Sequence, residues 1–358
     1  MIRQRAEPAR VRRLRMLMSK RNIDAMLVTQ RENLRYLTGF SGSSGCLLVS
    51  AGIPLLITDF RYKLQARVEA AGVRIQIQKK DLYSTIGDAA DDLGINTLWI
   101  DESNMTLDRI RALRKKGLRL RPSKDPVAEL RTRKDPFELA KIRKAVGRAE
   151  ESFEELKRFI RPGITERELG LKLEWLMRSK GARKEAFDTI VASGPNGAMP
   201  HASVSNRKLR SGDMVTIDFG AEADGYYCDI TRTHSVGRPS ARQREIHALV
   251  LKAQQEAVEK VKSGALCRDI DAAARNVIAA AGHGRHFGHA TGHGIGLMVH
   301  EGPSLSALAK SKVEAAMVFT IEPGIYVPGW GGVRIEDMVL VTPEGSRVLT
   351  SLPRDLEL

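Results

Sequence analysis

Four acidic residues lie inside otherwise apolar segments of the C-terminal half, and this feature most constrains the fold. The segments read VTIDF, CDI, TIEP and VRIED, and their acids are Asp218, Asp229, Glu322 and Glu336. Short apolar runs rich in β-branched residues predict strands. Because buried Asp and Glu are rare unless they are paired or bind metal, one such acid alone would indicate a core ion pair. Four acids in two hairpins instead favour a metal site.

The first two acids lie in a predicted hairpin, VTIDFGAEADGYYCDITRTH. If Ala223 and Asp224 form the centre of the turn, Asp218 lies directly opposite Asp229. If Asp224 and Gly225 form it, the register slips by two and the two acids become diagonal neighbours. Both registers leave the acids on one face, because side chains alternate with period two. Two carboxylates about 5–8 Å apart repel each other, so a cation between them or a proton on one of them is expected.

The second hairpin, FTIEPGIYVPGWGGVRIEDMVL, carries the other two acids. Glu322 and Glu336 flank the turn-rich segment 328–332 symmetrically, so their carboxylates are also expected to face each other.

Histidines are concentrated in one stretch: five of the eight lie between His283 and His300. A glycine-rich surface loop accounts for most of them. His293 differs, because it lies between Gly292 and Gly294 and leads into an apolar stretch. Glycines permit close approach of the backbone around a ligand, so His293 is a candidate metal ligand.

Charge balance supports two ions. Four carboxylates would neutralise two divalent cations, and one neutral imidazole would complete the set. This oxygen-rich donor set suits Mn²⁺, Co²⁺ or Fe²⁺ better than a structural thiolate-bound Zn²⁺. Two such ions about 3.5–4 Å apart activate water and polarise carbonyl groups, which is hydrolase chemistry.

Length and composition indicate a globular chain of two domains. The sequence has 358 residues, of which 42% are hydrophobic and 28% charged. An α/β N-terminal domain is expected over residues 1–130, because helix-like and strand-like segments alternate there. An α+β domain is expected over 131–358, after a charged, proline-interrupted stretch. No run is long and apolar enough to span a membrane, and the three cysteines suit a reducing cytoplasm.

The net charge of +15 is concentrated near the N-terminus, where residues 1–130 hold 24 Lys and Arg against 14 Asp and Glu. Contact with nucleic acid or an anionic surface is one interpretation. A solvated helix face is the preferred one, since no aromatic residues alternate with the arginines. The basic residues that dominate the first turns are Arg3, Arg5, Arg10, Arg12, Arg13 and Arg15.

Five segments together resemble the pita-bread-fold metallopeptidases: AFDTIVASGPNGAMPHA, VTIDFGAEADGYYCDITRT, GHGIGLMVHEGP, IEPGIY and GGVRIEDMVLVT. Within that family the chain is most similar to Xaa-Pro dipeptidases (prolidases) and aminopeptidase P. The resemblance implies a C-terminal pita-bread (creatinase/aminopeptidase-like) catalytic domain, preceded by a smaller α/β creatinase-type N-terminal domain. It also implies hydrolysis of the peptide bond before proline by metal-activated water.

The resemblance also implies roles for single residues. The metal ligands would be Asp218, Asp229, His293, Glu322 and Glu336. Glu322 would in addition carry protons for the metal-activated water. His201 and His300 would contact the substrate and its tetrahedral intermediate, and Arg334 would contact the substrate or support a ligand.

Several expectations accompany this assignment. The cofactor would be two divalent ions, with Mn²⁺ preferred over Co²⁺, Fe²⁺ or Zn²⁺. The substrates would be Xaa-Pro peptides, with dipeptidase and aminopeptidase P activity left open. The enzyme would be a cytoplasmic homodimer without membrane or nucleic-acid contacts. The competing hypothesis is a non-catalytic protein of the same fold that binds nucleic acid or a protein partner through its basic surface.

Overall fold

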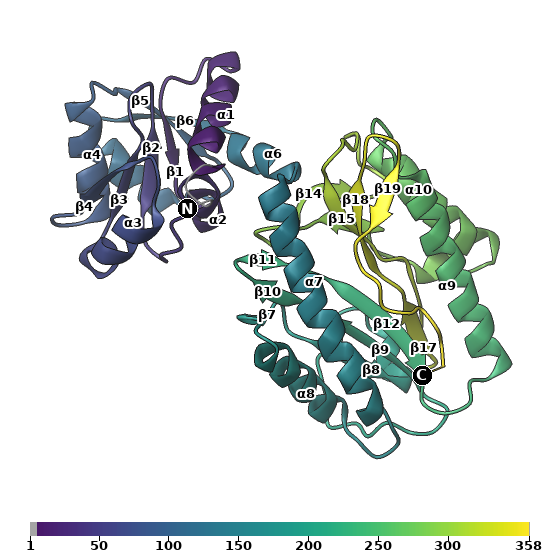
Figure 1. Cartoon of the computed structure of the whole chain (residues 1–358). Helices are drawn as coiled ribbons and strands as arrows, with labels where there is room; N and C mark the ends of the chain where they lie inside the picture. Colours follow the sequence, from purple (N-terminus) through teal and green to yellow (C-terminus); the bar gives the residue numbers. More distant parts are fainter. Residues whose placement is uncertain (1–5, 358) are drawn as a thin grey trace. The chain divides into compact units, whose positions relative to one another are not determined.

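The computed structural model describes residues 6–357, and by their contacts these form two compact units that divide between Arg131 and Thr132. Arg3 and Arg5 lie outside the described residues. Each unit has its own layers of helices and strands (Figure 1). No helix among residues 6–357 is long and apolar enough to cross a membrane.

The first unit is an α/β domain around one mixed six-stranded sheet, in the order β4-β3-β2-β1-β5-β6. Strands β1, β5 and β6 are parallel, whereas β2 runs antiparallel to both β1 and β3. The elements are α1 Ala6–Lys20, β1 Met26–Val28, α2 Arg31–Thr38, β2 Cys46–Val49, β3 Leu55–Thr58, η2 Phe60–Tyr62, α3 Lys63–Glu69, β4 Arg74–Ile77, α4 Leu82–Asp92, β5 Thr97–Asp101, α5 Leu107–Arg114 and β6 Arg119–Ser123. Helix α6 Pro126–Thr132 runs across the boundary between the units.

The arginine-rich helix α1 is not simply a solvated face, and that expectation needs correction for two residues. Arg10 is buried, stacks over the Tyr36 ring at 4.3 Å and donates to the Tyr36 carbonyl oxygen. Arg15 donates to the Ser50 carbonyl oxygen at 2.9 Å. These two guanidinium groups fix α1 to its own unit, because a buried cation requires hydrogen-bond acceptors.

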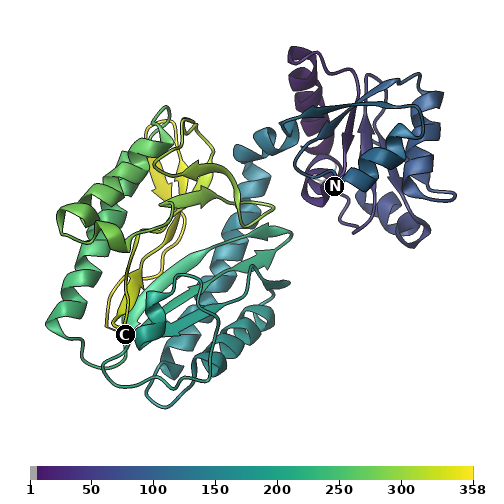
Figure 2. The ribbon, with the colours of Figure 1, turned by 180° about the vertical axis from the view of Figure 1, so that it is seen from behind.

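The second unit is the α+β domain expected from the sequence. Helices α7 and α8 lie along strands β8, β9 and β12, and helices α9 and α10 lie beside the strands of the other half, as the views from front and back agree (Figures 1 and 2). Its helices are α7 Pro136–Leu156, η3 Lys157–Phe159, α8 Glu166–Ser179, η4 Gly194–Ala198, α9 Ala241–Lys260, α10 Cys267–Ala280 and η5 Gly284–His286. Its strands are β7 Lys184–Glu185, β8 Ile190–Ser193, β9 Met214–Phe219, β10 Ala221–Ala223, β11 Tyr226–Tyr227, β12 Ile230–Ser235, β13 Gly292–Gly294, β14 Glu301–Leu305, β15 Val318–Ile321, β16 Gly324–Val327, β17 Gly331–Arg334, β18 Asp337–Val341 and β19 Ser346–Val348.

Capping boxes begin helices α7 and α8, and the sequence itself predicts both starts, because Asp135 and Thr165 are each followed three positions later by Glu. Asp135 accepts from the Glu138 amide while Glu138 accepts from the Asp135 amide. Thr165 and Glu168 make the same reciprocal pair at the start of α8. Each pair satisfies two helix-end donors, which fixes where the chain turns into the helix.

The first hairpin adopts the second of the two registers considered. Asp224 and Gly225 have φ values of 50° and 83°, as a type I′ turn requires. Thr231 therefore lies opposite Asp218, and Asp229 is its diagonal neighbour on the same face.

Candidate active site

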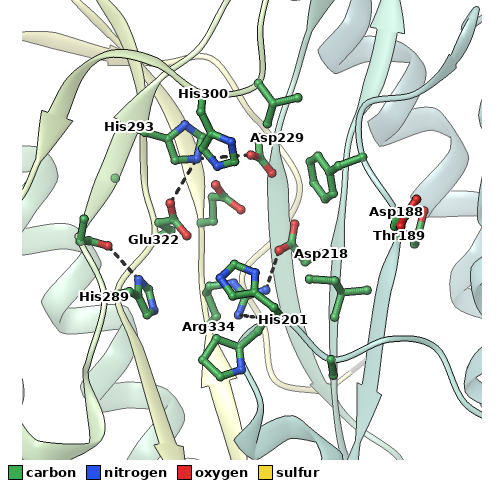
Figure 3. Close-up of a pocket in the computed structure, with 18 of the residues that line it drawn as sticks. Asp188, Thr189, His201, Asp218, Asp229, His289, His293, His300, Glu322 and Arg334 are labelled. Atoms are coloured by element: carbon green, nitrogen blue, oxygen red, sulfur yellow. Dashed lines mark hydrogen bonds and ion pairs between the residues drawn. The ribbon is translucent and has the colours of Figure 1, made fainter. Parts of the chain in front are cut away.

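Five strands or strand ends bring the predicted site residues to one place. Asp218 lies on β9 and Asp229 directly precedes β12. His293 lies on β13, while Glu322 follows β15 directly and Glu336 directly precedes β18. Figure 3 shows Asp218, Asp229, His293 and Glu322 converging on one pocket from opposite sides, and Glu336 also lines that pocket.

The second hairpin has the register that the sequence predicts. Ile321 lies opposite Asp337, and Gly324 lies opposite Arg334. The same register continues between these pairs, so Glu322 and Glu336 lie across from each other. The two hairpins thus supply two facing pairs of acids.

Glycines on both sides of His293 allow its strand to approach its neighbours. A Cβ atom on Gly292 would lie 1.9 Å from the Thr320 carbonyl oxygen. A Cβ atom on Gly294 would lie 2.0 Å from the Gly302 carbonyl oxygen. Any side chain at either position would push β13 away from its neighbours and move the imidazole with it.

The imidazole of His293 faces two of the carboxylates. Its Nε2 atom lies 3.6 Å from Asp229 Oδ2 and 3.4 Å from Glu322 Oε1. Its Nδ1 atom lies 3.2 Å from the Gly294 carbonyl oxygen, which indicates that Nδ1 carries the proton. Burial, and to a smaller extent the neighbouring His300, lowers the pKa of His293 to about 4. The ring is therefore neutral, with the Nε2 lone pair directed at the acids.

Asp229, Glu322 and Glu336 are buried close together, and the pKa values of all three are raised. Burial raises the pKa of Asp229 well above its usual value, and the negative charges of Glu336, Asp218 and Glu322 raise it further. Burial likewise raises the pKa of Glu336, which accepts a hydrogen bond from Thr231 Oγ1 at 2.7 Å. Burial raises the pKa of Glu322 to about 8. Such a cluster is costly unless protons or cations occupy it.

Asp218 is held differently from the other acids. Arg334 Nη2 donates to its Oδ2 atom at 2.6 Å, and both side chains are largely buried. The Oδ1 atom is buried and has no hydrogen-bond partner. An orphaned buried carboxylate oxygen is rare unless an ion or water takes it.

These observations fit divalent metal ions. Asp229, His293 and Glu336 each offer one ligand atom, and the three atoms lie within 4.8 Å of one another. The neighbouring Asp218 Oδ1 needs a partner, and Glu322 lies within reach of the same imidazole. Carboxylate oxygens with one neutral imidazole suit a divalent ion of intermediate hardness.

The remaining predicted residues lie in the same pocket, which has a volume of about 800 Å³. His201 follows η4, and His300 directly precedes β14. The His300 ring lies 4.2 Å from the His293 ring, centroid to centroid. Both histidines have exposed side chains and line the pocket.

Two functional neighbours were missed by the sequence analysis, which assigned most of the clustered histidines to a surface loop. His289 lines the pocket instead, and its Nε2 atom lies 2.9 Å from the Tyr326 hydroxyl. Arg334 Nη1 donates to the same hydroxyl at 3.0 Å. The chain from His289 through Tyr326 to Arg334 ends at Asp218. The spacing of the histidines does not reveal this network, but Tyr326, two residues after the IEPG segment, was an available signal.

Antiparallel sheets that bring four carboxylates and one imidazole into a single pocket are typical of a metal-dependent hydrolase. Comparison with known families agrees: residues 140–343 match the model of metallopeptidase family M24. Residues 10–133 match the creatinase/prolidase N-terminal domain. The chain belongs to metallopeptidase family M24, which confirms both the resemblance and the fold class inferred from the sequence.

Similar proteins cover nearly the whole chain. An Xaa-Pro dipeptidase of Pyrococcus horikoshii is 38% identical over 97% of this chain and 98% of its own length. The structure of an Xaa-Pro dipeptidase from Bacillus anthracis has a TM-score of 0.95 at 40% identity, covering 98% of this chain and all of that one. The structure of an X-Pro aminopeptidase from Thermotoga maritima has a TM-score of 0.90 at 38% identity, covering 97% of this chain and 100% of that one.

Proposed function

We propose that this metallo-exopeptidase hydrolyses the peptide bond before proline, with Xaa-Pro dipeptides as its substrates. The observation that carries the proposal is the convergence of four carboxylates and one neutral imidazole in a single pocket. The names of relatives that match nearly the whole chain support the choice of substrate. The competing hypothesis of a non-catalytic binding protein finds no support, because a binder has no use for a costly buried acid cluster.

Two divalent ions are the proposed cofactor, with Mn²⁺ as the preferred ion. Asp218, Asp229, His293, Glu322 and Glu336 would hold them. When bound, the ions polarise the scissile carbonyl and lower the pKa of water. A peptide bond before proline is a tertiary amide without an N–H, so an enzyme that activates the carbonyl and water needs no donor from the amide.

The protein's own side chains supply the remaining steps. Glu322 lies at the pocket surface beside His293, and it would take a proton from the attacking water and return it to the proline nitrogen. His201 and His300 would donate hydrogen bonds to the oxygen on which negative charge develops. Arg334 would hold Asp218 in its orientation through the 2.6 Å ion pair, in addition to any contact with the substrate.

The proposal extends to the setting of the enzyme. We propose that residues 131–358 carry the catalytic apparatus and that residues 1–130 form the creatinase-type domain. A homodimer is proposed from the family resemblance. A cytoplasmic location is proposed because Cys46, Cys228 and Cys267 are all free and buried, as suits a reducing compartment.

The test is purification without chelator, followed by metal analysis and comparison of Ala-Pro with a tripeptide Xaa-Pro-Yaa. Cleavage of the dipeptide alone supports a dipeptidase, whereas cleavage of the tripeptide indicates aminopeptidase P activity. A protein that binds manganese or cobalt and cleaves neither peptide would overturn the proposal.

A further inference from the structure

The segment that carries His201 begins at Ser193, the last residue of β8, and ends at Ser205. Ser205 lies next to the first turn of α8. His201 lies in the middle of this segment, with its side chain exposed to the pocket. An exposed imidazole in a connecting segment has no strand to hold it. Its position therefore depends on how the two ends of the segment are fixed.

A single buried carboxylate joins the two ends. Glu166, the first residue of α8, has no exposed surface. Its Oε1 atom accepts from the Ser193 amide and hydroxyl, both at 2.7 Å. Its Oε2 atom accepts from the Ser205 amide at 3.3 Å and from the Ser205 hydroxyl. Asn196 Nδ2 donates to both oxygens at 3.0 Å.

Backbone hydrogen bonds hold the returning end against the same helix turn. The Glu166 amide donates to the Arg207 carbonyl oxygen at 3.1 Å, and the Arg167 amide donates to the Ser205 carbonyl oxygen at 3.0 Å. On the pocket side, Arg334 Nη1 donates to the Pro200 carbonyl oxygen at 3.3 Å, one residue before His201. The segment is thus fixed at its base by Glu166 and at its tip by Arg334.

We propose that Glu166 is a positioning residue for His201: its carboxylate closes the base of the 193–205 segment and so sets where the imidazole meets the substrate. The inference rests on the proposed function, in which His201 contacts the reacting oxygen. Glu166 touches none of the five candidate metal ligands by any hydrogen bond of the described residues.

The chemistry explains why this position needs a carboxylate. All the groups that reach Glu166 donate N–H or O–H hydrogen bonds, and a carboxylate offers two acceptor oxygens without a competing N–H. Replacement by Gln keeps the size but turns one oxygen into an NH₂ group, which would face the donors of Asn196 and one of the serine amides. The segment must then shift to separate donor from donor.

The experiment is a double-mutant cycle on the metal-loaded enzyme with Ala-Pro as substrate. It uses Glu166→Gln, His201→Asn and the double variant, with bound metal and thermal unfolding measured for each. Glu168→Gln is the matched control, because Glu168 lies in the same helix turn but only caps it at the surface. We expect Glu166→Gln to lower kcat/KM roughly tenfold or more, since small displacements of catalytic groups have such effects. Glu168→Gln should leave kcat/KM unchanged, and all variants should retain metal.

The decisive comparison is Glu166→Gln in the His201→Asn background. If Glu166 acts through His201, the double variant has a kcat/KM less than about twofold below that of His201→Asn alone. An equal loss in both backgrounds would overturn the inference and leave Glu166 with a purely structural role. If His201→Asn retains full turnover, the inference also fails. The proposed function is judged separately, by whether the wild-type enzyme cleaves Ala-Pro.

Because the substitution of a fully buried residue such as Glu166 can impair folding, Ser205→Ala provides a second test of the positioning role. Ser205 is only half-buried, and its removal takes one donor from Glu166 without placing a new group in the site. We expect a smaller loss of kcat/KM, roughly threefold, that again disappears in the His201→Asn background. A loss that persists in that background would contradict the positioning role.

Discussion

Replacing Glu322 by Gln should have opposite effects on the metal-free and metal-loaded protein. Burial raises the pKa of Glu322 from about 4.5 to about 8 in the folded chain. A carboxyl group whose folded-state pKa is raised disfavours folding increasingly as the pH rises from the unfolded value to the folded one. At pH 7 the difference amounts to about 3 kcal/mol of unfolding free energy. Glutamine keeps the shape and the acceptor for Thr320 Oγ1, but it has no charge to bury.

The assay is urea unfolding of the chelator-treated protein between pH 4.5 and pH 8. Glu322→Gln should be more stable than the wild type at pH 7, by up to about 3 kcal/mol. The difference should nearly vanish at pH 4.5, where the carboxyl group is protonated in the folded protein and only half ionised in the unfolded chain. With manganese added, the order should reverse, because the variant lacks a ligand. Glu168→Gln is the control, since hydrogen bonds from Thr165 lower the pKa of that exposed acid and no gain is expected. A metal-free variant no more stable than the wild type at pH 7 would refute the reasoning.

Four further outcomes are expected. Glu336→Ala should abolish turnover and reduce bound metal in elemental analysis; a fully active variant would remove Glu336 from the ligand set. His300→Ala should lower turnover roughly a hundredfold while the metal content stays unchanged, because its proposed hydrogen bond forms in the transition state. Burial lowers the pKa of His234 to about 3, so the unfolded chain takes up its proton first as the pH falls below about 6.5. Unfolding by urea should therefore show a loss of about 2 kcal/mol between pH 7 and pH 5 that is absent from His234→Gln. Gly294→Ala should lower the unfolding free energy by about 3 kcal/mol and weaken metal binding, because its Cβ atom would lie 2.0 Å from the Gly302 carbonyl oxygen; unchanged metal affinity in calorimetry would contradict this.

Local patterns predicted much of the fold, because neighbours in sequence determined it. The capping residues Asp135 and Thr165 marked the helix starts, since a cap acts within one turn. The facing of Glu322 and Glu336 followed from the symmetry of one hairpin. The register of the first hairpin stayed open between two choices, because it depended on whether Ala223-Asp224 or Asp224-Gly225 forms the turn with two positive φ values.

Contacts between distant segments could not be predicted in this way. The tie from Glu166 to the His201 segment joins residues 27 and 39 positions apart in the chain. The burial of Arg10 against Tyr36 likewise depends on how α1 and α2 pack. The sequence of a basic helix does not show that one of its arginines packs on an aromatic ring and donates to a carbonyl oxygen of another helix.

The four acids differ in a way that the sequence does not show. Asp218 forms an ion pair with Arg334, a buried cation that also donates hydrogen bonds to Tyr326 and Thr231. Among residues 6–357, neither Asp229 nor Glu336 forms an ion pair with Lys or Arg, and burial and neighbouring acids raise the pKa of each despite the more distant charge of Arg334. Binding of divalent ions would relieve the repulsion at those two residues, which are also the two carboxylates whose oxygen atoms lie within 4.8 Å of a ring nitrogen of His293. Arg334 is paired with Asp218, so negative charge without an ion-pair partner is left beside the lone pair of His293, and this arrangement favours a metal site over a buried ion pair.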